Sequence, residues 1–136
     1  MAYTDNFKRQ HQELLAMVGE IAGKLKSDPA DAKALRALLS GLAGKLTVHL
    51  AMEDKALYPR LMQQQDARST ALAGKFMKEM GGLAQVFATY NNKWQVTAIK
   101  ADPAGFSDET RKVFGALAHR IGRENTELYP LADKTE

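Results

Sequence analysis

The chain has 136 residues, 45% of them hydrophobic and 26% charged, which is typical of a folded protein and predicts a single domain over residues 1–136. Its net charge of +3 comes from Lys and Arg that are interleaved with Asp and Glu, so the basic stripe that a nucleic-acid partner requires is missing. Because there is no cysteine, disulfides and thiolate metal sites are excluded, and any metal must bind nitrogen and oxygen ligands.

The amino-terminal residues MAYTDNFKRQ are polar and lack the apolar stretch of a signal peptide, and no segment is long and apolar enough for a membrane span. We therefore expect a cytoplasmic protein without a membrane partner. The first helix follows Asp5, a candidate N-cap. Apolar residues and one histidine recur in it at three- and four-residue intervals: Phe7, His11, Leu14, Leu15, Val18 and Ile21.

Three further helices are predicted by the same periodicity. The second runs from about Asp31 to near Met62 and kinks or ends at Pro59, the third runs from about Ser69 to Lys100, and the fourth, capped by Asp108, runs to about Tyr129. No segment alternates as a strand should. Four helices with short connections predict an all-α fold, an antiparallel up-down-up-down four-helix bundle.

One short pattern occurs twice, a histidine and a glutamate followed by Leu-Tyr-Pro, at His49–Pro59 and at His119–Pro130. The third of the three histidines is His11. A shift of 71 residues aligns the Glu-x3-Leu-Tyr-Pro segments of the two patterns, and a shift of 69 residues places Met80 at the position of His11. The chain therefore resembles two related helical hairpins. Imidazoles and carboxylates on separate helices have the composition of a metal site inside a bundle.

Spacing decides whether the paired residues can share a metal. His49 and Glu53 are four residues apart, which separates them by about 40° around an α-helix, so both point the same way. His119 and Glu124 are five apart, or roughly 140° in a regular helix, and then they cannot both be ligands. A one-residue π-bulge would realign them, and Gly122 between them would tolerate the altered backbone.

Two glutamates on apolar stripes, Glu53 and Glu124, indicate a buried cation, because a buried carboxylate without a positive partner is costly. On the third helix the thioether of Met80 is a soft ligand better suited to packing, whereas the neighbouring Glu79 could supply a carboxylate. The candidate metal ligands are His11, His49, Glu53, Glu79, His119 and Glu124.

This arrangement of one histidine in the first helix, His-x3-Glu in the second and His-x4-Glu in the fourth resembles hemerythrin and the hemerythrin-like (HHE cation-binding) domains, over nearly the whole chain. The resemblance implies a four-helix bundle holding two irons, bridged by carboxylates, with an open position for dioxygen. By position, it implies that His11 and His49 bind one iron, that Glu53 and Glu124 bridge, and that His119 binds the other iron.

The third helix departs from that family. Hemerythrins carry a His-x3-His pair there, whereas this chain has Phe76 and Met80, which removes two imidazoles from the second iron and weighs against a standard dinuclear centre and reversible oxygen carriage. The missing ligands could come from Glu79 or from a tyrosine phenolate, the candidates being Tyr58, Tyr90 and Tyr129. Alternatively, the three histidines and one or two carboxylates could hold a single iron, zinc or manganese ion.

The predicted function is therefore a metal-binding bundle, with one or two iron ions per chain, that binds or senses dioxygen, another small diatomic ligand, redox state or iron. The alternative is a degenerate bundle without a dinuclear site, acting as a structural or interaction module. An oxidase or peroxidase ranks third, because no substrate-positioning motif is visible. Whether the chain is an enzyme, its oligomeric state and its partner proteins stay open at this level.

Overall fold

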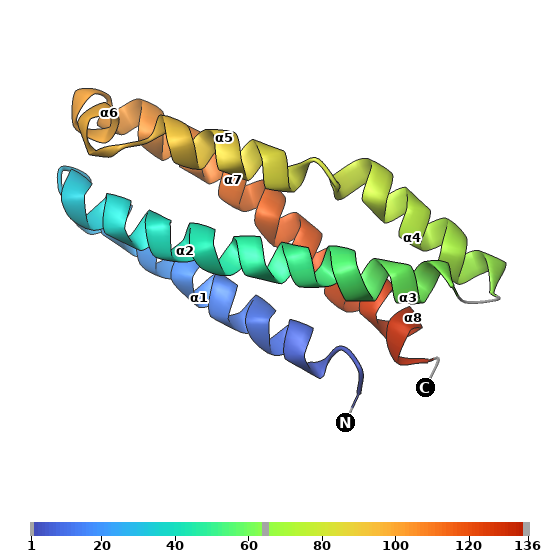
Figure 1. Cartoon of the computed structure of the whole chain (residues 1–136). Helices are drawn as coiled ribbons and strands as arrows, with labels where there is room; N and C mark the ends of the chain where they lie inside the picture. Colours follow the sequence, from blue (N-terminus) through green and yellow to red (C-terminus); the bar gives the residue numbers. More distant parts are fainter. Residues whose placement is uncertain (1, 64–65, 135–136) are drawn as a thin grey trace.

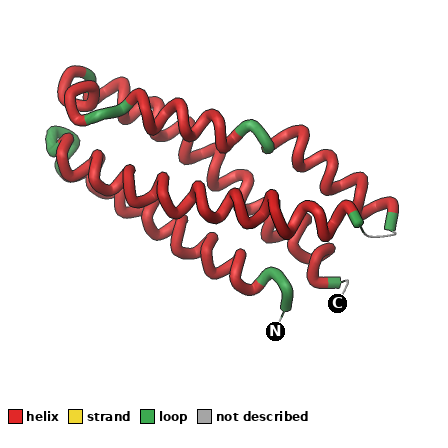
Figure 2. The backbone as a smooth tube through the Cα atoms, in the orientation of Figure 1, coloured by secondary structure: helices red, strands yellow, loops and turns green. Residues whose placement is uncertain are grey.

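A computed structural model describes residues 2–63 and 66–134, and these residues form helices and connecting turns without a strand (Figures 1 and 2). In chain order the helices are α1 (Asp5–Ser27), α2 (Ala32–Met52), η1 (Glu53–Leu57), α3 (Tyr58–Met62), α4 (Ala67–Met80), α5 (Leu83–Lys93), α6 (Val96–Ala101), α7 (Pro103–Arg123), η2 (Glu124–Leu128) and α8 (Tyr129–Asp133). The segments η1 and η2 are single π-helical turns.

These elements make four long rods that run alternately up and down (Figure 1). The first rod is α1, the second is α2 continued through η1 into α3, the third is α4 followed by α5, and the fourth is α7 continued through η2 into α8. The predicted all-α, antiparallel four-helix bundle is therefore confirmed. The described ends of the chain lie at the same end of the bundle, where the Thr4 hydroxyl donates a hydrogen bond to Asp133.

The second rod matches its prediction at both ends. Asp31 caps α2, since its side chain accepts a hydrogen bond from the amide of Ala34 at 3.1 Å, and the helix continues past Pro59 to Met62. At the start of the first rod, Asp5 is the first helical residue and Thr4 takes the N-cap position, so the cap lies one residue earlier than predicted.

The third and fourth rods differ from prediction. The expected single helix over Ser69–Lys100 begins at Ala67 and is broken twice, at Gly81 and again after Lys93. A side chain at Gly81 would collide with the carbonyl of Met77, which accounts for glycine at the first break. At the second break, Arg36 donates hydrogen bonds to the carbonyls of Asn91 and Trp94 at the end of α5.

The fourth rod begins at Pro103, five residues before the predicted cap at Asp108. Its actual cap is Asp102, whose side chain accepts a hydrogen bond from the amide of Gly105 at 2.9 Å. Proline suits the first turn of a helix because its missing N–H would have no helical partner there. The helix therefore begins within the polar stretch around Pro103.

Two apolar clusters fill the bundle. The larger runs along the middle and far end and includes Leu14, Leu46 and Leu117, and the smaller surrounds Leu57, Phe76, Leu128 and Tyr129 near the chain ends. Three buried polar residues separate the clusters: His11, Glu53 and Glu124. On the rod of each, residues of one cluster come before it in the sequence and residues of the other come after it. Among the described residues, no helix is long and apolar enough to cross a membrane.

Candidate metal centre

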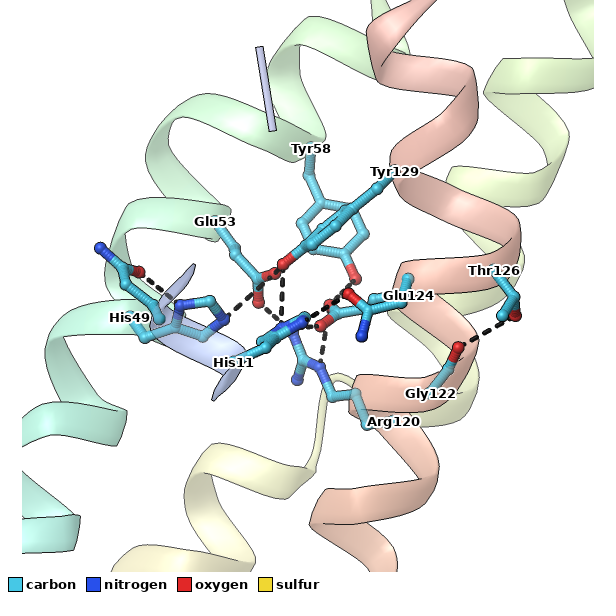
Figure 3. Close-up of polar contacts among 11 residues, drawn as sticks. His11, His49, Glu53, Tyr58, Arg120, Gly122, Glu124, Thr126 and Tyr129 are labelled. Atoms are coloured by element: carbon cyan, nitrogen blue, oxygen red, sulfur yellow. Dashed lines mark hydrogen bonds and ion pairs between the residues drawn. The ribbon is translucent and has the colours of Figure 1, made fainter. Parts of the chain in front are cut away.

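Four buried side chains converge between the two apolar clusters (Figure 3). They are His11 from α1, His49 from α2, Glu53 at the start of η1 and Glu124 at the start of η2. Each offers one nitrogen or oxygen atom, and these four atoms all lie within 4.8 Å of one another. Two imidazole nitrogens and two carboxylate oxygens form a donor set that suits a first-row transition metal.

Both imidazoles are oriented by side-chain amides. The Nδ1 atom of His49 lies 2.6 Å from Oε1 of Gln10, and Nδ1 of His11 lies 2.8 Å from Oδ1 of Asn125. An amide oxygen only accepts hydrogen bonds, so each Nδ1 carries a proton, and each Nε2 is the ring atom turned toward the glutamates. These hydrogen bonds fix both rings in the orientation in which Nε2 can bind a metal.

The two Nε2 atoms face the glutamates. Nε2 of His11 lies 3.1 Å from Oε1 of Glu124, and Nε2 of His49 lies 3.4 Å from Oε2 of Glu53. Nε2 of His49 is also buried and makes no hydrogen bond within the part of the chain that the structure describes. A buried nitrogen without a hydrogen bond, aimed at a carboxylate oxygen, fits a site for a cation.

The fifth member of the cluster is Arg120, which lies in α7 and is only 5% exposed. Its Nη2 is 3.2 Å from Oε1 of Glu53, and its Nε is 3.2 Å from Oε2 of Glu124. Burial lowers the pKa of Arg120, but the two glutamate charges outweigh burial and raise it, so the guanidinium is a fixed positive charge.

The pKa values of the two glutamates shift in opposite directions. Burial raises the pKa of Glu53, but contacts with His49, Tyr129 and Arg120 outweigh it, and the pKa falls below its ordinary value. For Glu124, burial and the negative charge of Glu53 prevail over His11 and Arg120, and its pKa is raised. Two carboxylates this close share their positive partners unequally, so Glu53 is the more firmly ionised of the two.

The π segments place a tyrosine beside each glutamate. In each segment the amide of the tyrosine donates to the carbonyl of the glutamate five residues earlier, Tyr58 to Glu53 and Tyr129 to Glu124. This five-residue bond stacks both side chains on the inner face, whereas a regular α-helix would place them roughly 140° apart. At the second segment the Thr126 hydroxyl donates to the Gly122 carbonyl at 2.9 Å (Figure 3).

Each tyrosine donates to the glutamate of the other rod. The Tyr129 hydroxyl donates to Oε2 of Glu53 at 2.5 Å and lies 3.0 Å from Nε2 of His11, and the Tyr58 hydroxyl donates to Oε2 of Glu124 at 3.4 Å. Burial, reinforced by the glutamate charges, raises the pKa of both phenols well above its ordinary value. Both tyrosines therefore serve as hydrogen-bond donors to the carboxylates.

His119 and Glu79, two of the predicted ligands, lie outside this cluster. His119 is on the exposed face of α7, because the π turn begins at Glu124 and the helix between the two residues is regular. The bulge considered between His119 and Glu124 is therefore absent. A π turn instead begins at Glu124, and Arg120 takes the inward position. Glu79 is exposed and accepts a hydrogen bond from Nη1 of Arg123 at 2.9 Å.

Among the tyrosines considered as ligands, Tyr90 belongs to the larger apolar cluster, where its hydroxyl lies 2.6 Å from Oγ1 of Thr110. Phe76 is fully buried in the smaller apolar cluster. The side chain of Met80 lies outside the described part of the structure.

Sequence reasoning missed Arg120, Gln10 and Asn125. For Arg120 a signal existed, since the 71-residue shift that aligns the two Leu-Tyr-Pro segments also places His49 on Arg120. Both residues stand four positions before a glutamate, so the repeat pointed to Arg120 as the inward residue and not to His119. The two amides carry no comparable signal, because a lone Gln or Asn beside a candidate ligand is ordinary on a helix.

Comparison with known families agrees with this geometry. The model of the hemerythrin HHE cation-binding domain matches residues 3–132, which is nearly the full length of the chain. No curated protein and no solved structure gives a significant match to the chain.

Proposed function

Because the chain belongs to the hemerythrin HHE cation-binding domain family, a family of metal-binding helical bundles, we propose that it binds iron through His11, His49, Glu53 and Glu124. The observation that carries this proposal is the convergence of two inward Nε2 atoms and two carboxylates, all buried, within 4.8 Å. Nitrogen and oxygen donors of this kind suit iron, and zinc or manganese as competitors.

We further propose that the bound iron serves to bind or sense dioxygen, another diatomic ligand, redox state or iron itself. Ferrous iron would supply a redox-active centre with room in its coordination sphere for a small ligand. The protein residues exclude water from it, since Leu57, Phe76 and Leu128 on one side are fully buried. The Tyr129 hydroxyl donates to Oε2 of Glu53, with 2.5 Å between the two oxygens, and orients that carboxylate.

Metal analysis tests the binding step. Protein purified from iron-supplied cells is expected to contain at least one iron per chain, and His49→Ala is expected to lose it, because His49 contributes one of only two nitrogen donors. His119→Ala is the matched control and should retain the metal, since that ring is exposed on α7. Equal loss in both variants would contradict the ligand assignment.

The sensing step needs a separate experiment. Anaerobic ferrous protein, mixed with dioxygen or nitric oxide, is expected to change its near-ultraviolet and visible absorption. The His49→Ala protein, treated in the same way, should show no such change. An absorption spectrum of the iron-loaded wild type that neither gas alters would contradict a role in binding diatomic ligands, while leaving iron binding intact.

A second candidate function is a structural or interaction bundle without a metal. The contacts of Arg120 with both glutamates favour it, because a guanidinium already compensates part of their charge. This candidate predicts only traces of metal in the purified protein and no uptake when iron, zinc or manganese is added. Stoichiometric uptake excludes it.

A further inference from the structure

The two halves of the cluster correspond to each other through the internal repeat. On the second rod His49 precedes Glu53 by four residues, and Glu53 begins a π turn. On the fourth rod Arg120 precedes Glu124 by four residues, and Glu124 begins the other π turn. The repeat therefore replaces an imidazole by a guanidinium at one of two equivalent positions.

Each glutamate turns one carboxylate oxygen toward Arg120 and the other toward a histidine. In Glu53, Oε1 faces Nη2 of Arg120 and Oε2 faces Nε2 of His49. In Glu124, Oε2 faces Nε of Arg120 and Oε1 faces Nε2 of His11. In Figure 3 the ring of His49 and the guanidinium of Arg120 approach the glutamates from different directions, and the ring of His11 overlaps the guanidinium in this view. Each carboxylate thus bridges a guanidinium and an imidazole.

We propose that the Arg120 guanidinium is a built-in second cation of this centre, and that the site holds a single metal ion on the side of His11 and His49. This inference rests on the proposed function, because it fixes how many ions the same residues bind. The ion would use one oxygen of each carboxylate, and the other oxygen of each remains with Arg120.

A second ion is disfavoured for two reasons. It would have to displace or approach a buried guanidinium, and repulsion between cations is strong where water is excluded. It would also lack nitrogen donors, since His119 is exposed and the third rod contributes the fully buried ring of Phe76 to an apolar cluster. The described groups on that side are carboxylate oxygens and the Tyr58 hydroxyl.

The first test is the stoichiometry of the wild-type chain, titrated with Co(II) in the absence of air and measured by elemental analysis and by calorimetry. The expected result is one Co(II) per chain with a single binding event. Two ions per chain would overturn this inference while leaving the proposed metal binding intact. No uptake of Co(II) or Fe(II) would overturn both, so the two failures are distinguishable.

The second test replaces the guanidinium. Arg120→His supplies an imidazole four residues before Glu124, as His49 does for Glu53, and is expected to raise the stoichiometry from one to two Co(II) per chain. Arg120→Lys keeps a positive charge and should still bind one. Arg123→His is the matched control on the same helix, where Arg123 pairs with Glu79 and Glu127 outside the cluster, and it should also bind one.

Circular dichroism establishes that each variant is folded before its stoichiometry is compared. If Arg120→His binds one ion while folded, the guanidinium is not what excludes the second ion and the inference fails. If Arg120→His does not fold, the wild-type and Arg120→Lys titrations still decide, because two ions in either protein would contradict exclusion by a fixed positive charge.

Discussion

At the scale of single residues, the candidate site is organised by side chains that do not contact the cation position themselves. Gln10 and Asn125 accept hydrogen bonds from the Nδ1 atoms of His49 and His11, and Tyr129 donates to Glu53. Such partners set the tautomer and orientation of a metal ligand and hold it in place. The charged guanidinium of Arg120 contacts both glutamates, Glu124 on its own rod and Glu53 on the second rod.

Removing one of these amides should weaken metal binding without abolishing it. Gln10→Ala takes away the acceptor for Nδ1 of His49, so the ring loses its fixed tautomer and orientation. We expect the metal affinity to fall by about 10–100-fold, as is usual for partners of this type. Competition titration against a chelator measures the change. Gln12→Ala, at an exposed position of α1, is the control, and an equal effect there would contradict this role.

At the scale of elements, the two π turns determine which residues face the interior beyond each glutamate. In η1 the extra residue brings Leu57 and Tyr58 into the smaller apolar cluster, together with Leu61 of α3. The turn in η2 does the same for Leu128 and Tyr129. If the same residues formed a regular α-helix, those beyond each turn would be rotated by about 100°, which would turn part of the apolar face outward.

Insertion of one alanine after Lys55, an exposed residue within η1, should therefore destabilise the protein. The lengthened segment would turn Leu57, Tyr58 and Leu61 away from their cluster. Because burying such side chains contributes roughly 1.5–3 kcal/mol each, we expect the free energy of unfolding to fall by more than about 3 kcal/mol. Urea denaturation measures it. The substitution Lys55→Ala keeps the length of the turn and should change stability little.

The contact between the chain ends gives a pH-dependent prediction. Burial raises the pKa of Asp133, but hydrogen bonds from the amide and hydroxyl of Thr4 outweigh burial and lower it. A carboxyl group whose pKa is lowered by folding stabilises the fold above its unfolded-state pKa, and this stability is lost as pH falls through the folded-state pKa. The loss should therefore occur below about pH 4.

Asp133→Asn should accordingly cost about 1–2 kcal/mol at neutral pH, since hydrogen bonds to a charged group are lost. Its difference from the wild type should shrink as the pH falls below about 4, where the wild-type carboxyl also becomes neutral. Thermal melts across this range measure both effects. Asp108→Asn removes an exposed ion pair with Arg111 and should change stability little at any of these pH values.

At the scale of the whole molecule, the site lies between the two apolar clusters and takes its ligands from three of the four rods, so metal binding and folding are linked. The ligands come from α1, α2, η1 and η2, and the chain must be folded to bring them together. A ligand that binds only the folded state stabilises it by mass action. Within the proposed function, the metal therefore contributes to the stability of the whole bundle.

Adding metal should raise the melting temperature in a concentration-dependent way. At a free metal concentration of 100 times Kd, the expected stabilisation is about 2.7 kcal/mol. For a chain of this size the melting temperature should rise on the order of 10 °C. Scanning calorimetry with and without a chelator measures the difference. A melting temperature that the chelator leaves unchanged, in protein shown to bind metal, would contradict a site assembled by folding.

The bundle and three of the four converging side chains follow from local patterns. Apolar residues at helical spacing are enough to predict four helices, and the four-residue spacing of His49 and Glu53 places both on one face whatever they pack against. His11 follows in the same way from the apolar stripe of α1. These predictions need only the spacing of residues within a single helix.

The inward residue of the fourth rod depends instead on packing between rods. Neighbouring residues such as His119 and Arg120 differ by about 100° around a helix, so the choice between them depends on where the π turn lies. That turn is stable because it buries Leu128 and Tyr129 against residues of other rods, which no local pattern specifies. Tertiary packing therefore put a guanidinium, and not an imidazole, between the two glutamates.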